Sequence, residues 1–324
     1  MIPLENYKTT FLNYLSENIK TKEPQNLYEP ISYILSLGGK RLRPILTLMS
    51  CELFNTPHQK ALNAALAVEL FHNFSLIHDD IMDNAPLRRG KETVHEKWDI
   101  NTGILSGDAM LILAYQLFEN YEATTFQQLA KLFSKTAIEV CEGQQYDVDF
   151  EERDSVSTEE YLHMINFKTA VLVGASMQMG AIIAGASKQC QNGIYEFGRN
   201  LGIAFQIQDD YLDVFGDPKS FGKQVGGDII SNKKTYLYLT AKKEASATDS
   251  IELEQLYSLQ PKNSADKIEA VTQIFINSGA QEKTKLKIKH FTEVAINLLN
   301  NLQITESGKK QLTHFANQLI YRIT

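Results

Sequence analysis

The stretch LFHNFSLIHDDIMD, residues 70–83, is an apolar run of helical spacing that ends in three carboxylates. Asp79, Asp80 and Asp83 take the first, second and fifth positions, which point within about 100° of one another on a helix. Like charges four residues apart destabilise a helix, and more so when they are partly desolvated. The stretch therefore predicts a helix that ends in a cation site. A divalent cation held by carboxylates and completed by phosphate oxygens fits best, which favours Mg²⁺.

A second stretch, DDYLD at residues 209–213, repeats the same spacing with Asp209, Asp210 and Asp213. A single cluster of this kind could be a solvated helix end. Two matching clusters beside basic loops argue for a binding role, and two acidic faces imply more than one metal ion.

Away from these clusters, apolar residues recur at three- and four-residue spacing through most of the chain, and alternating runs rich in β-branched residues are almost absent. The pattern predicts an all-α bundle whose long helices line a deep central cavity. The longest are expected at about residues 58–84, 102–119, 124–150, 168–187 and 190–215. Both acidic clusters then lie at the C-terminal end of a helix.

Composition limits the possible domain organisation, partners and compartment further. The chain has 324 residues, 43% of them hydrophobic, and 32 Lys and Arg against 39 Asp and Glu give a net charge of −7. No linker or composition shift divides it, so we expect a single domain over residues 1–324. The acidic balance argues against nucleic-acid binding. The odd number of cysteines (Cys51, Cys141 and Cys190) and the lack of a signal pattern predict a cytoplasmic protein with buried thiols.

Three polar connections place basic residues next to these acidic clusters. Residues 38–44, GGKRLRP, place three cations beside two glycines, and residues 84–91, NAPLRRGK, follow the first acidic cluster. Lys219 and Lys223 follow the second. Carboxylate-bound Mg²⁺ with loop arginines and lysines is a diphosphate-binding arrangement. Such a site can stabilise a diphosphate as it leaves carbon, and aromatic side chains such as Phe205 can stabilise the carbocation that forms.

With these motifs, the chain resembles the trans-isoprenyl diphosphate synthases from about residue 38 to residue 235. The resemblance implies the isoprenoid synthase type of helical bundle, and about three Mg²⁺ ions that hold an allylic diphosphate. The metal ligands it implies are Asp79, Asp80, Asp83, Asp209, Asp210 and Asp213. The positions it implies for isopentenyl diphosphate are Lys40, Arg43, His72 and Arg89. Those for the allylic diphosphate and its cation are Arg88, Lys168, Thr169, Gln206 and Lys233, with Lys223 as an addition near the metals.

The implied reaction is head-to-tail condensation of isopentenyl diphosphate with dimethylallyl, geranyl or farnesyl diphosphate. The metals draw off the allylic diphosphate, the isopentenyl double bond attacks the cation, and the departing diphosphate takes the proton. The protein would contribute positioning and charge stabilisation. The resemblance also implies a homodimer, and the reaction requires no membrane.

Helix geometry places residues that could limit the length of the product beneath the first cluster. Ser75 lies one turn, about 6 Å, below Asp79 and only about 40° away in azimuth. A small side chain there leaves room for the first turn of a product tail, whereas Phe74 and Phe71 can narrow the cavity lower down. The same pair of positions resembles the geranylgeranyl type of synthase, so we expect a C20 product, with C15 as the alternative.

Two other functions share part of this pattern. A terpene cyclase has the same fold and metals, but its second metal motif differs and it needs no isopentenyl site. A non-catalytic subunit of a prenyl synthase tends to lose an aspartate motif, and this chain keeps both. Release of diphosphate without added isopentenyl diphosphate would favour the cyclase.

Overall fold

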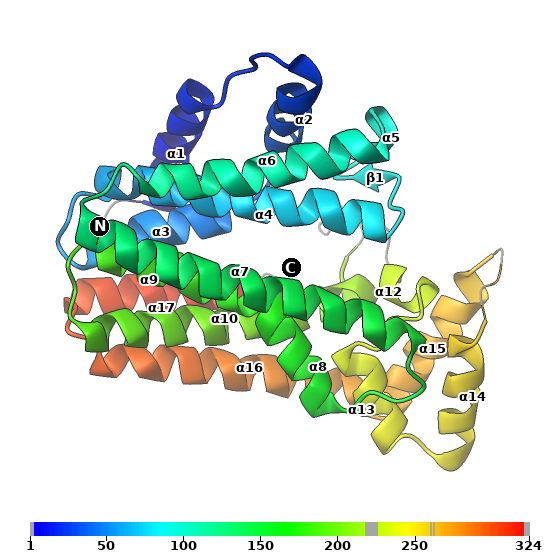
Figure 1. Cartoon of the computed structure of the whole chain (residues 1–324). Helices are drawn as coiled ribbons and strands as arrows, with labels where there is room; N and C mark the ends of the chain where they lie inside the picture. Colours follow the sequence, from blue (N-terminus) through cyan, green and yellow to red (C-terminus); the bar gives the residue numbers. More distant parts are fainter. Residues whose placement is uncertain (1–2, 218–225, 260, 262, 321–324) are drawn as a thin grey trace. The chain divides into compact units, whose positions relative to one another are not determined.

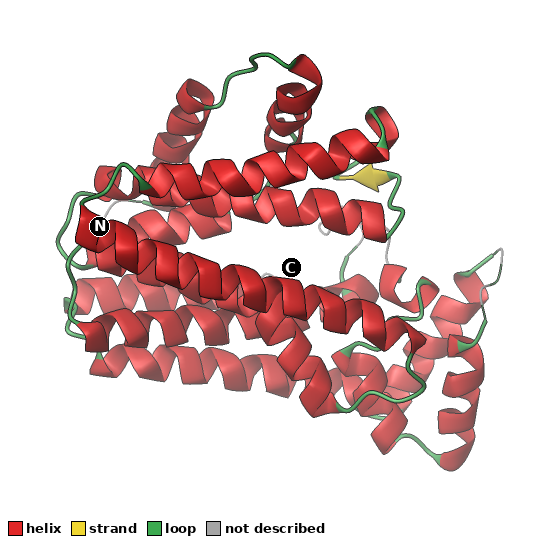
Figure 2. Cartoon of the chain, viewed as in Figure 1, coloured by secondary structure: helices red, strands yellow, loops and turns green. Residues whose placement is uncertain are grey.

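The computed structural model describes residues 3–217, 226–259, 261 and 263–320. Helices make up almost all of the regular structure in these ranges, and two short strands form the one hairpin there (Figure 2). The all-α prediction is confirmed.

The described chain divides into two compact units that share three helices (Figure 1). Unit 1 comprises Met1–Lys135, Ala175–Tyr195 and Gln303–Thr305, and unit 2 comprises Thr136–Gly174, Glu196–Leu302 and Glu306–Thr324. The boundaries fall inside α7 (Ala123–Glu152), α9 (Val171–Ile183) and α10 (Lys188–Phe215). The single domain over residues 1–324 stays a prediction.

The remaining elements lie within one unit. Those of unit 1 are α1 (Leu4–Asn18), α2 (Gln25–Ser36), α3 (Leu42–Leu53), η1 (His58–Ala61), α4 (Leu62–Met82), β1 (Leu87–Arg88), β2 (Lys91–Glu92), α5 (Val94–Lys97) and α6 (Ile100–Phe118). Those of unit 2 are α8 (Thr158–Ile165), the π-helical segment η2 (Asn166–Ala170), α12 (Gly227–Ile230), α13 (Tyr236–Glu244), α14 (Ala247–Tyr257), α15 (Ala265–Asn277), α16 (Ala280–Leu298), η3 (Leu299–Asn301) and α17 (Glu306–Ile320).

The five long helices expected from periodicity are present, with two differences. The helix expected over 58–84 is α4, and it begins at Leu62 because residues 58–61 form the 3₁₀ segment η1. The helix expected over 168–187 is α9, and it begins at Val171 because the chain before it forms the π-helical segment η2. The first acidic cluster lies at the C-terminal end of α4, and the second occupies the last turns of α10. The sequence therefore predicted where both clusters sit on their helices.

In unit 1, α4 and α6 pack closely side by side (Figure 1). Glycines of α6 make this possible, since a Cβ at Gly103 would come within 2.9 Å of Ile81 and one at Gly107 would press on the His78 ring, with Cδ2 at 2.7 Å and Nε2 closer still. The close packing fixes the last turns of α4, which carry the first acidic cluster.

In unit 2, η2 is held between two other glycines. A Cβ at Gly143 of α7 would lie 2.7 Å from the Lys168 Cα, and one at Gly202 of α10 would lie 2.8 Å from the Ala170 Cα. The backbone of η2 therefore passes close to both helices.

Two further expectations concern exposure. Cys51 and Cys190 are buried, but Cys141 is exposed on α7, so the prediction that all three thiols are buried was wrong for Cys141. Its position falls on the solvent side of an amphipathic helix. In the ranges the structure describes, we find no helix with the length and apolar character needed to cross a bilayer.

Candidate active site

The first acidic cluster is joined to the hairpin that follows α4. β1 and β2 pair antiparallel with Arg88 opposite Lys91, and the two loop residues, Arg89 and Gly90, both have positive φ. A two-residue turn with this backbone matches the twist of a hairpin. The turn brings Arg88 back over the cluster, eight residues after Asp80.

Asp80 and Arg88 form a bidentate ion pair. The Arg88 Nε donates to both Asp80 oxygens, at 2.9 and 2.8 Å, and Nη2 lies 2.6 Å from Oδ1. Asp80 is only 1% exposed, and burial raises the pKa of its carboxyl, while the Arg88 hydrogen bonds and charge act in the opposite direction. Asp79 is half-buried, with an oxygen 3.5 Å from Arg88 Nη2, and Asp83 is exposed.

The residues expected to bind isopentenyl diphosphate lie in the same unit. Arg43 Nη1 is 3.2 Å from His72 Nε2, and burial, followed by the charge of Arg43, holds the pKa of His72 well below its usual value. Arg89 donates to the Gly38 carbonyl, and a Cβ at Gly39 would approach its guanidinium to 2.8 Å. The structure thus brings together Arg43, His72 and Arg89.

Lys40 is exposed beside this group. Arg41, the cation between Lys40 and Arg43, turns inward instead. It is 5% exposed, has a left-handed backbone, and pairs with the buried Glu69 of α4. Sequence reasoning missed this pair, because nothing in the run of cations marks which one turns inward.

The middle carboxylate of the second acidic cluster accepts hydrogen bonds from two neutral side chains. Asp210 is 8% exposed, and it accepts hydrogen bonds from the Tyr161 hydroxyl at 2.5 Å and from Gln206 Nε2 at 2.9 Å. Burial raises the pKa of the Asp210 carboxyl, and the charge of Asp228 raises it further, against the two hydrogen bonds. Asp209 is half-buried beside it.

Asp213, the last member of the second cluster, ties α10 to the chain that follows. Its Oδ2 accepts the Asp228 N–H at 2.9 Å, and its carbonyl accepts the Gly226 N–H at 2.6 Å. Burial raises the pKa of Tyr257 well above its usual value, with Asp228 and Asp213 as further causes. The second cluster is therefore part of an acidic region that includes Asp228.

Lys168 and Thr169 are presented by η2. Lys168 Nζ lies 2.7 Å from an oxygen of Asp147, and Thr169 Oγ1 donates to Gln206 Oε1 at 3.0 Å. π-helical turns occur often at functional sites, because the extra residue changes which side chains face the same way. Here η2 places two consecutive side chains on neighbours from α7 and α10.

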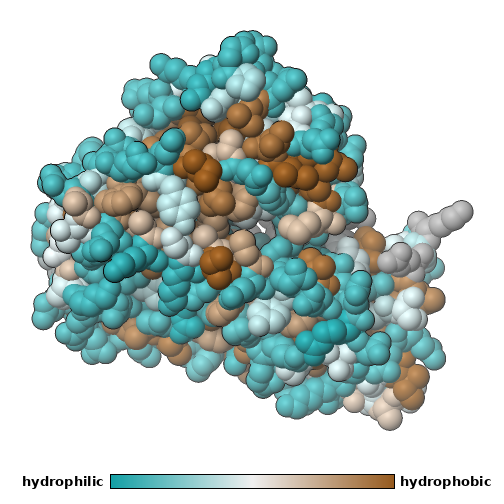
Figure 3. Space-filling model, viewed as in Figure 1, coloured by the Kyte–Doolittle hydropathy of each residue, from teal (hydrophilic) through white to brown (hydrophobic). Residues whose placement is uncertain are grey.

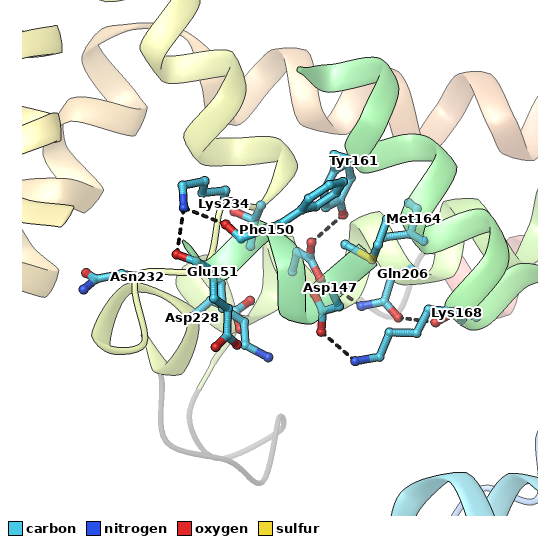
Figure 4. Close-up of a pocket in the computed structure, with 15 residues that line it drawn as sticks. Asp147, Phe150, Glu151, Tyr161, Met164, Lys168, Gln206, Asp228, Asn232 and Lys234 are labelled. Carbon is cyan, nitrogen blue, oxygen red and sulfur yellow. Dashed lines mark hydrogen bonds and ion pairs between the residues drawn. The ribbon is translucent and has the colours of Figure 1, made fainter. Parts of the chain in front are cut away.

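A cavity of about 110 Å³ in unit 2 is lined by these residues (Figure 4). Lys168, Thr169, Gln206 and Lys233, four of the residues that the resemblance implies for the allylic diphosphate and its cation, all line it, whereas Arg88 lies in unit 1. Tyr161, Asp147, Asp228 and Lys234 also line it and were not assigned a role from sequence. Lys223 lies outside the described residues.

The chain-length residues lie at different depths in unit 1. Phe71 is fully buried, and its ring packs against Phe133 of α7 with centroids 5.1 Å apart. Phe74 is half-buried against His78, and the Ser75 hydroxyl donates to the His72 carbonyl at 2.8 Å. Phe74 is thus the accessible member of the pair.

The donor set suits a Mg²⁺ ion that is shared with substrate phosphates better than a metal ion held by protein ligands alone. In the part of the chain that the structure describes, no three Asp, Glu, His or Cys side chains converge to hold a metal ion by themselves. Mg²⁺ usually takes one or two carboxylates and completes its coordination with substrate phosphates and water. The partly exposed carboxylates of Asp79, Asp83 and Asp209 suit that use.

Comparison with protein families shows which family this chain belongs to. The model of the polyprenyl synthetase family matches residues 24–275. The chain belongs to the polyprenyl synthetase family. The match includes both acidic clusters, the hairpin with Arg88 and Arg89, η2 and the turn with Lys233.

Known members of the family are similar along almost the whole chain. A geranylgeranyl pyrophosphate synthase of Geoglobus acetivorans is 37% identical over 95% of this chain and 94% of its own. A geranylfarnesyl diphosphate synthase of Natronomonas pharaonis is 36% identical over 92% of this chain and 87% of its own. A crystal structure of a geranylgeranyl pyrophosphate synthase is 55% identical, covers 99% of each chain and has a TM-score of 0.96.

Proposed function

We propose that this short-chain prenyltransferase condenses isopentenyl diphosphate head to tail with dimethylallyl, geranyl and farnesyl diphosphates, and that its main product is geranylgeranyl diphosphate. One observation carries the proposal: each of two carboxylate clusters lies within its unit beside cationic side chains, Arg88 in unit 1 and Lys168 in unit 2. Metal-binding carboxylates next to cations suit a diphosphate, which needs positive charge on several sides.

Magnesium is the metal that this donor set favours. We assign its binding to the two clusters, Asp79, Asp80 and Asp83 together with Asp209, Asp210 and Asp213. When bound, the ions neutralise the diphosphate and make it a better leaving group. The number of ions, about three as the family resemblance implies, stays a prediction.

The protein's own groups bind and orient the two substrates. In unit 1, Lys40, Arg43, His72 and Arg89 suit the diphosphate of isopentenyl diphosphate, and the neutral His72 can donate a hydrogen bond without adding charge. In unit 2, Lys168 and Lys233 suit the allylic diphosphate, and Thr169 and Gln206 suit the carbon end. The role predicted for Lys223 near the metal ions stays a prediction.

The bonds change in a fixed order. The allylic C–O bond breaks and its electron pair leaves with diphosphate. The isopentenyl double bond then forms the new C–C bond at the cationic carbon, and the proton lost from the isopentenyl unit passes to the released diphosphate. The described site residues supply positioning and electrostatic stabilisation in this scheme.

The product length rests on the residues below the first cluster. Ser75 is small and half-buried, whereas Phe74 is a half-buried aromatic one residue earlier. The curated relatives include enzymes named for geranylgeranyl and for the longer geranylfarnesyl diphosphate, which supports C20 over the alternative C15. Phe74→Ala should lengthen the product. An unchanged product distribution would place the stop elsewhere.

A homodimer is part of the proposal. On α6, Leu105 is 60% exposed and Ile112 is 58% exposed, two turns apart on one face, with Ile104 beside them. Hydrophobic side chains gather over this part of unit 1 (Figure 3). An exposed apolar stripe on a helix marks an interaction surface. Light scattering should give twice the 36.6 kDa mass of the chain, and Leu105→Glu should reduce it.

The decisive test of the reaction is the dependence of diphosphate release on isopentenyl diphosphate. We expect the purified chain with Mg²⁺ to release diphosphate from dimethylallyl diphosphate only when isopentenyl diphosphate is added, and EDTA to abolish the release. Release without isopentenyl diphosphate would favour a terpene cyclase. No release under either condition would favour a non-catalytic subunit.

A further inference from the structure

A chain of three hydrogen bonds runs through unit 2 from Tyr161 to Thr169 (Figure 4). The Tyr161 hydroxyl donates to Asp210 Oδ2 at 2.5 Å, and Gln206 Nε2 donates to Asp210 Oδ1 at 2.9 Å. Thr169 Oγ1 then donates to Gln206 Oε1 at 3.0 Å. The four side chains come from α8, α10 and η2.

The direction of each hydrogen bond follows from the groups involved. The Gln206 NH₂ group faces Asp210 Oδ1, and an amide NH₂ group can only donate. The Gln206 carbonyl then faces Thr169 and can only accept. A threonine hydroxyl has one proton, and that proton is used on Gln206. The Thr169 oxygen is left with lone pairs for any other neighbour.

Tyr161 fixes the start of this chain. It is 2% exposed, and Asp210 is 8% exposed, so water competes poorly for their hydrogen bond. With Oδ2 held by Tyr161, the carboxylate plane of Asp210 is fixed and Oδ1 is available to Gln206. Without the hydroxyl, Asp210 could rotate, and the Gln206 amide would lose the partner that sets its orientation.

We propose that Tyr161 is a positioning residue that sets the polarity of Thr169, so that Thr169 offers lone pairs and not a proton to the carbon that becomes cationic. The proposal rests on the function proposed above, in which the allylic carbon gains positive charge. A lone pair directed at that carbon stabilises the charge, whereas an O–H dipole pointed at it opposes the charge. Thr169 touches the reacting carbon in this scheme, and Tyr161 acts on it only through Asp210 and Gln206.

Binding of two unreactive ligands tests the polarity directly. One is an allylic diphosphate analogue with an ammonium nitrogen in place of the reacting carbon, and the other is a thiolo-diphosphate of the same length, which has no positive charge at that position. Isothermal titration calorimetry with Mg²⁺ gives the Kd of each for the wild-type chain and for Tyr161→Phe. We expect Tyr161→Phe to reduce the preference for the ammonium analogue about tenfold, and to change the Kd of the thiolo-diphosphate less than about twofold.

Matched variants separate this role from a merely structural one. Tyr238→Phe removes the hydroxyl of another buried tyrosine of unit 2 and should leave the preference unchanged. Thr169→Val should reduce the preference as Tyr161→Phe does, and the double variant should lose no more than Thr169→Val alone, because both act through one oxygen.

The outcomes distinguish this proposal from the function on which it rests. A wild-type chain that forms prenyl product, together with a Tyr161→Phe variant of unchanged preference, overturns the polarity role alone. Equal weakening of both ligands in Tyr161→Phe also overturns it, since a loosened pocket would act on both. A wild-type chain that forms no product with isopentenyl diphosphate overturns the proposed function and the inference with it.

Discussion

The middle aspartate of the first cluster, Asp80, is held by the guanidinium of Arg88, whereas its counterpart in the second cluster, Asp210, is held by the neutral Tyr161 and Gln206. Both carboxylates are buried, and burial raises the pKa of each. Asp80 has a cation in contact. Asp210 instead has the charge of Asp228 acting on it. The same sequence spacing therefore serves two electrostatic arrangements.

This difference indicates what each cluster needs. The first cluster is partly neutralised by its own hairpin, so its structure depends on Arg88 being in place. In the second, the buried Asp210 accepts hydrogen bonds from two neutral side chains and lies in the field of Asp228, so a bound cation should stabilise this carboxylate more. Removing a charge at the Asp80–Arg88 pair should therefore lower the free energy of unfolding. Removing the charge of Asp210 should leave it unchanged or raise it.

Removal of Arg88 should have the largest effect. Arg88→Met leaves Asp80 buried without its cation, and breaking a buried ion pair on one side costs about 3 kcal/mol of the free energy of unfolding. Chemical denaturation without metal measures it. The double variant Arg88→Met with Asp80→Asn should regain most of the loss, because no buried charge is left alone. A loss below about 1 kcal/mol for Arg88→Met would show that the pair is not what holds the hairpin.

Gly143→Ala should be next, and it acts on the side of the second cluster. The added methyl group would press on the backbone of η2, 2.6 Å from the Phe167 carbonyl carbon. Overpacking of this kind costs about 2 kcal/mol, and here it would also displace Lys168 and Thr169. We expect a lower kcat together with a lower midpoint of unfolding. Gln145→Ala, an exposed position on the same helix, should leave both nearly unchanged.

The last pair of variants includes the smallest expected effect, that of Asp210→Asn, and it is the most informative about the comparison. Asp80→Asn weakens the charge-assisted bonds to Arg88 and should cost about 2 kcal/mol of unfolding free energy without metal. Asp210→Asn removes a buried negative charge that has no cation in contact, so the metal-free protein should be as stable as the wild type or more so. If Asp210→Asn destabilises the metal-free chain as much as Asp80→Asn does, the two clusters are not compensated differently.

Helical spacing and the spacing of carboxylates are local patterns, and they predicted the all-α fold, the long helices and the place of both clusters at helix ends. The partners of those clusters are not local. Arg88 reaches Asp80 through a hairpin whose strands have two residues each, too short to leave an alternating pattern. Tyr161 lies 49 residues before Asp210, and only tertiary packing brings them together.

The same limit explains the other differences. η2 replaces the first three residues of an expected helix, where Gly143 and Gly202 let its backbone approach α7 and α10. Nothing in the local sequence pattern marks these two glycines as contacts of residues 166–170. Arg41 pairs with Glu69 at the turn before α3, where the burial of one cation among three depends on the left-handed backbone of that residue. A periodic pattern predicts which face of a helix is buried, but not which single charge is buried with it.

The assignment of a geranylgeranyl product is tested most directly by chromatography of the wild-type products. The purified chain would be incubated with Mg²⁺, dimethylallyl diphosphate and an excess of isopentenyl diphosphate, and the dephosphorylated products separated by reversed-phase chromatography. We predict a main product of C20. A main product of C15, or of C30 and longer, would contradict the chain-length role of Ser75 and Phe74.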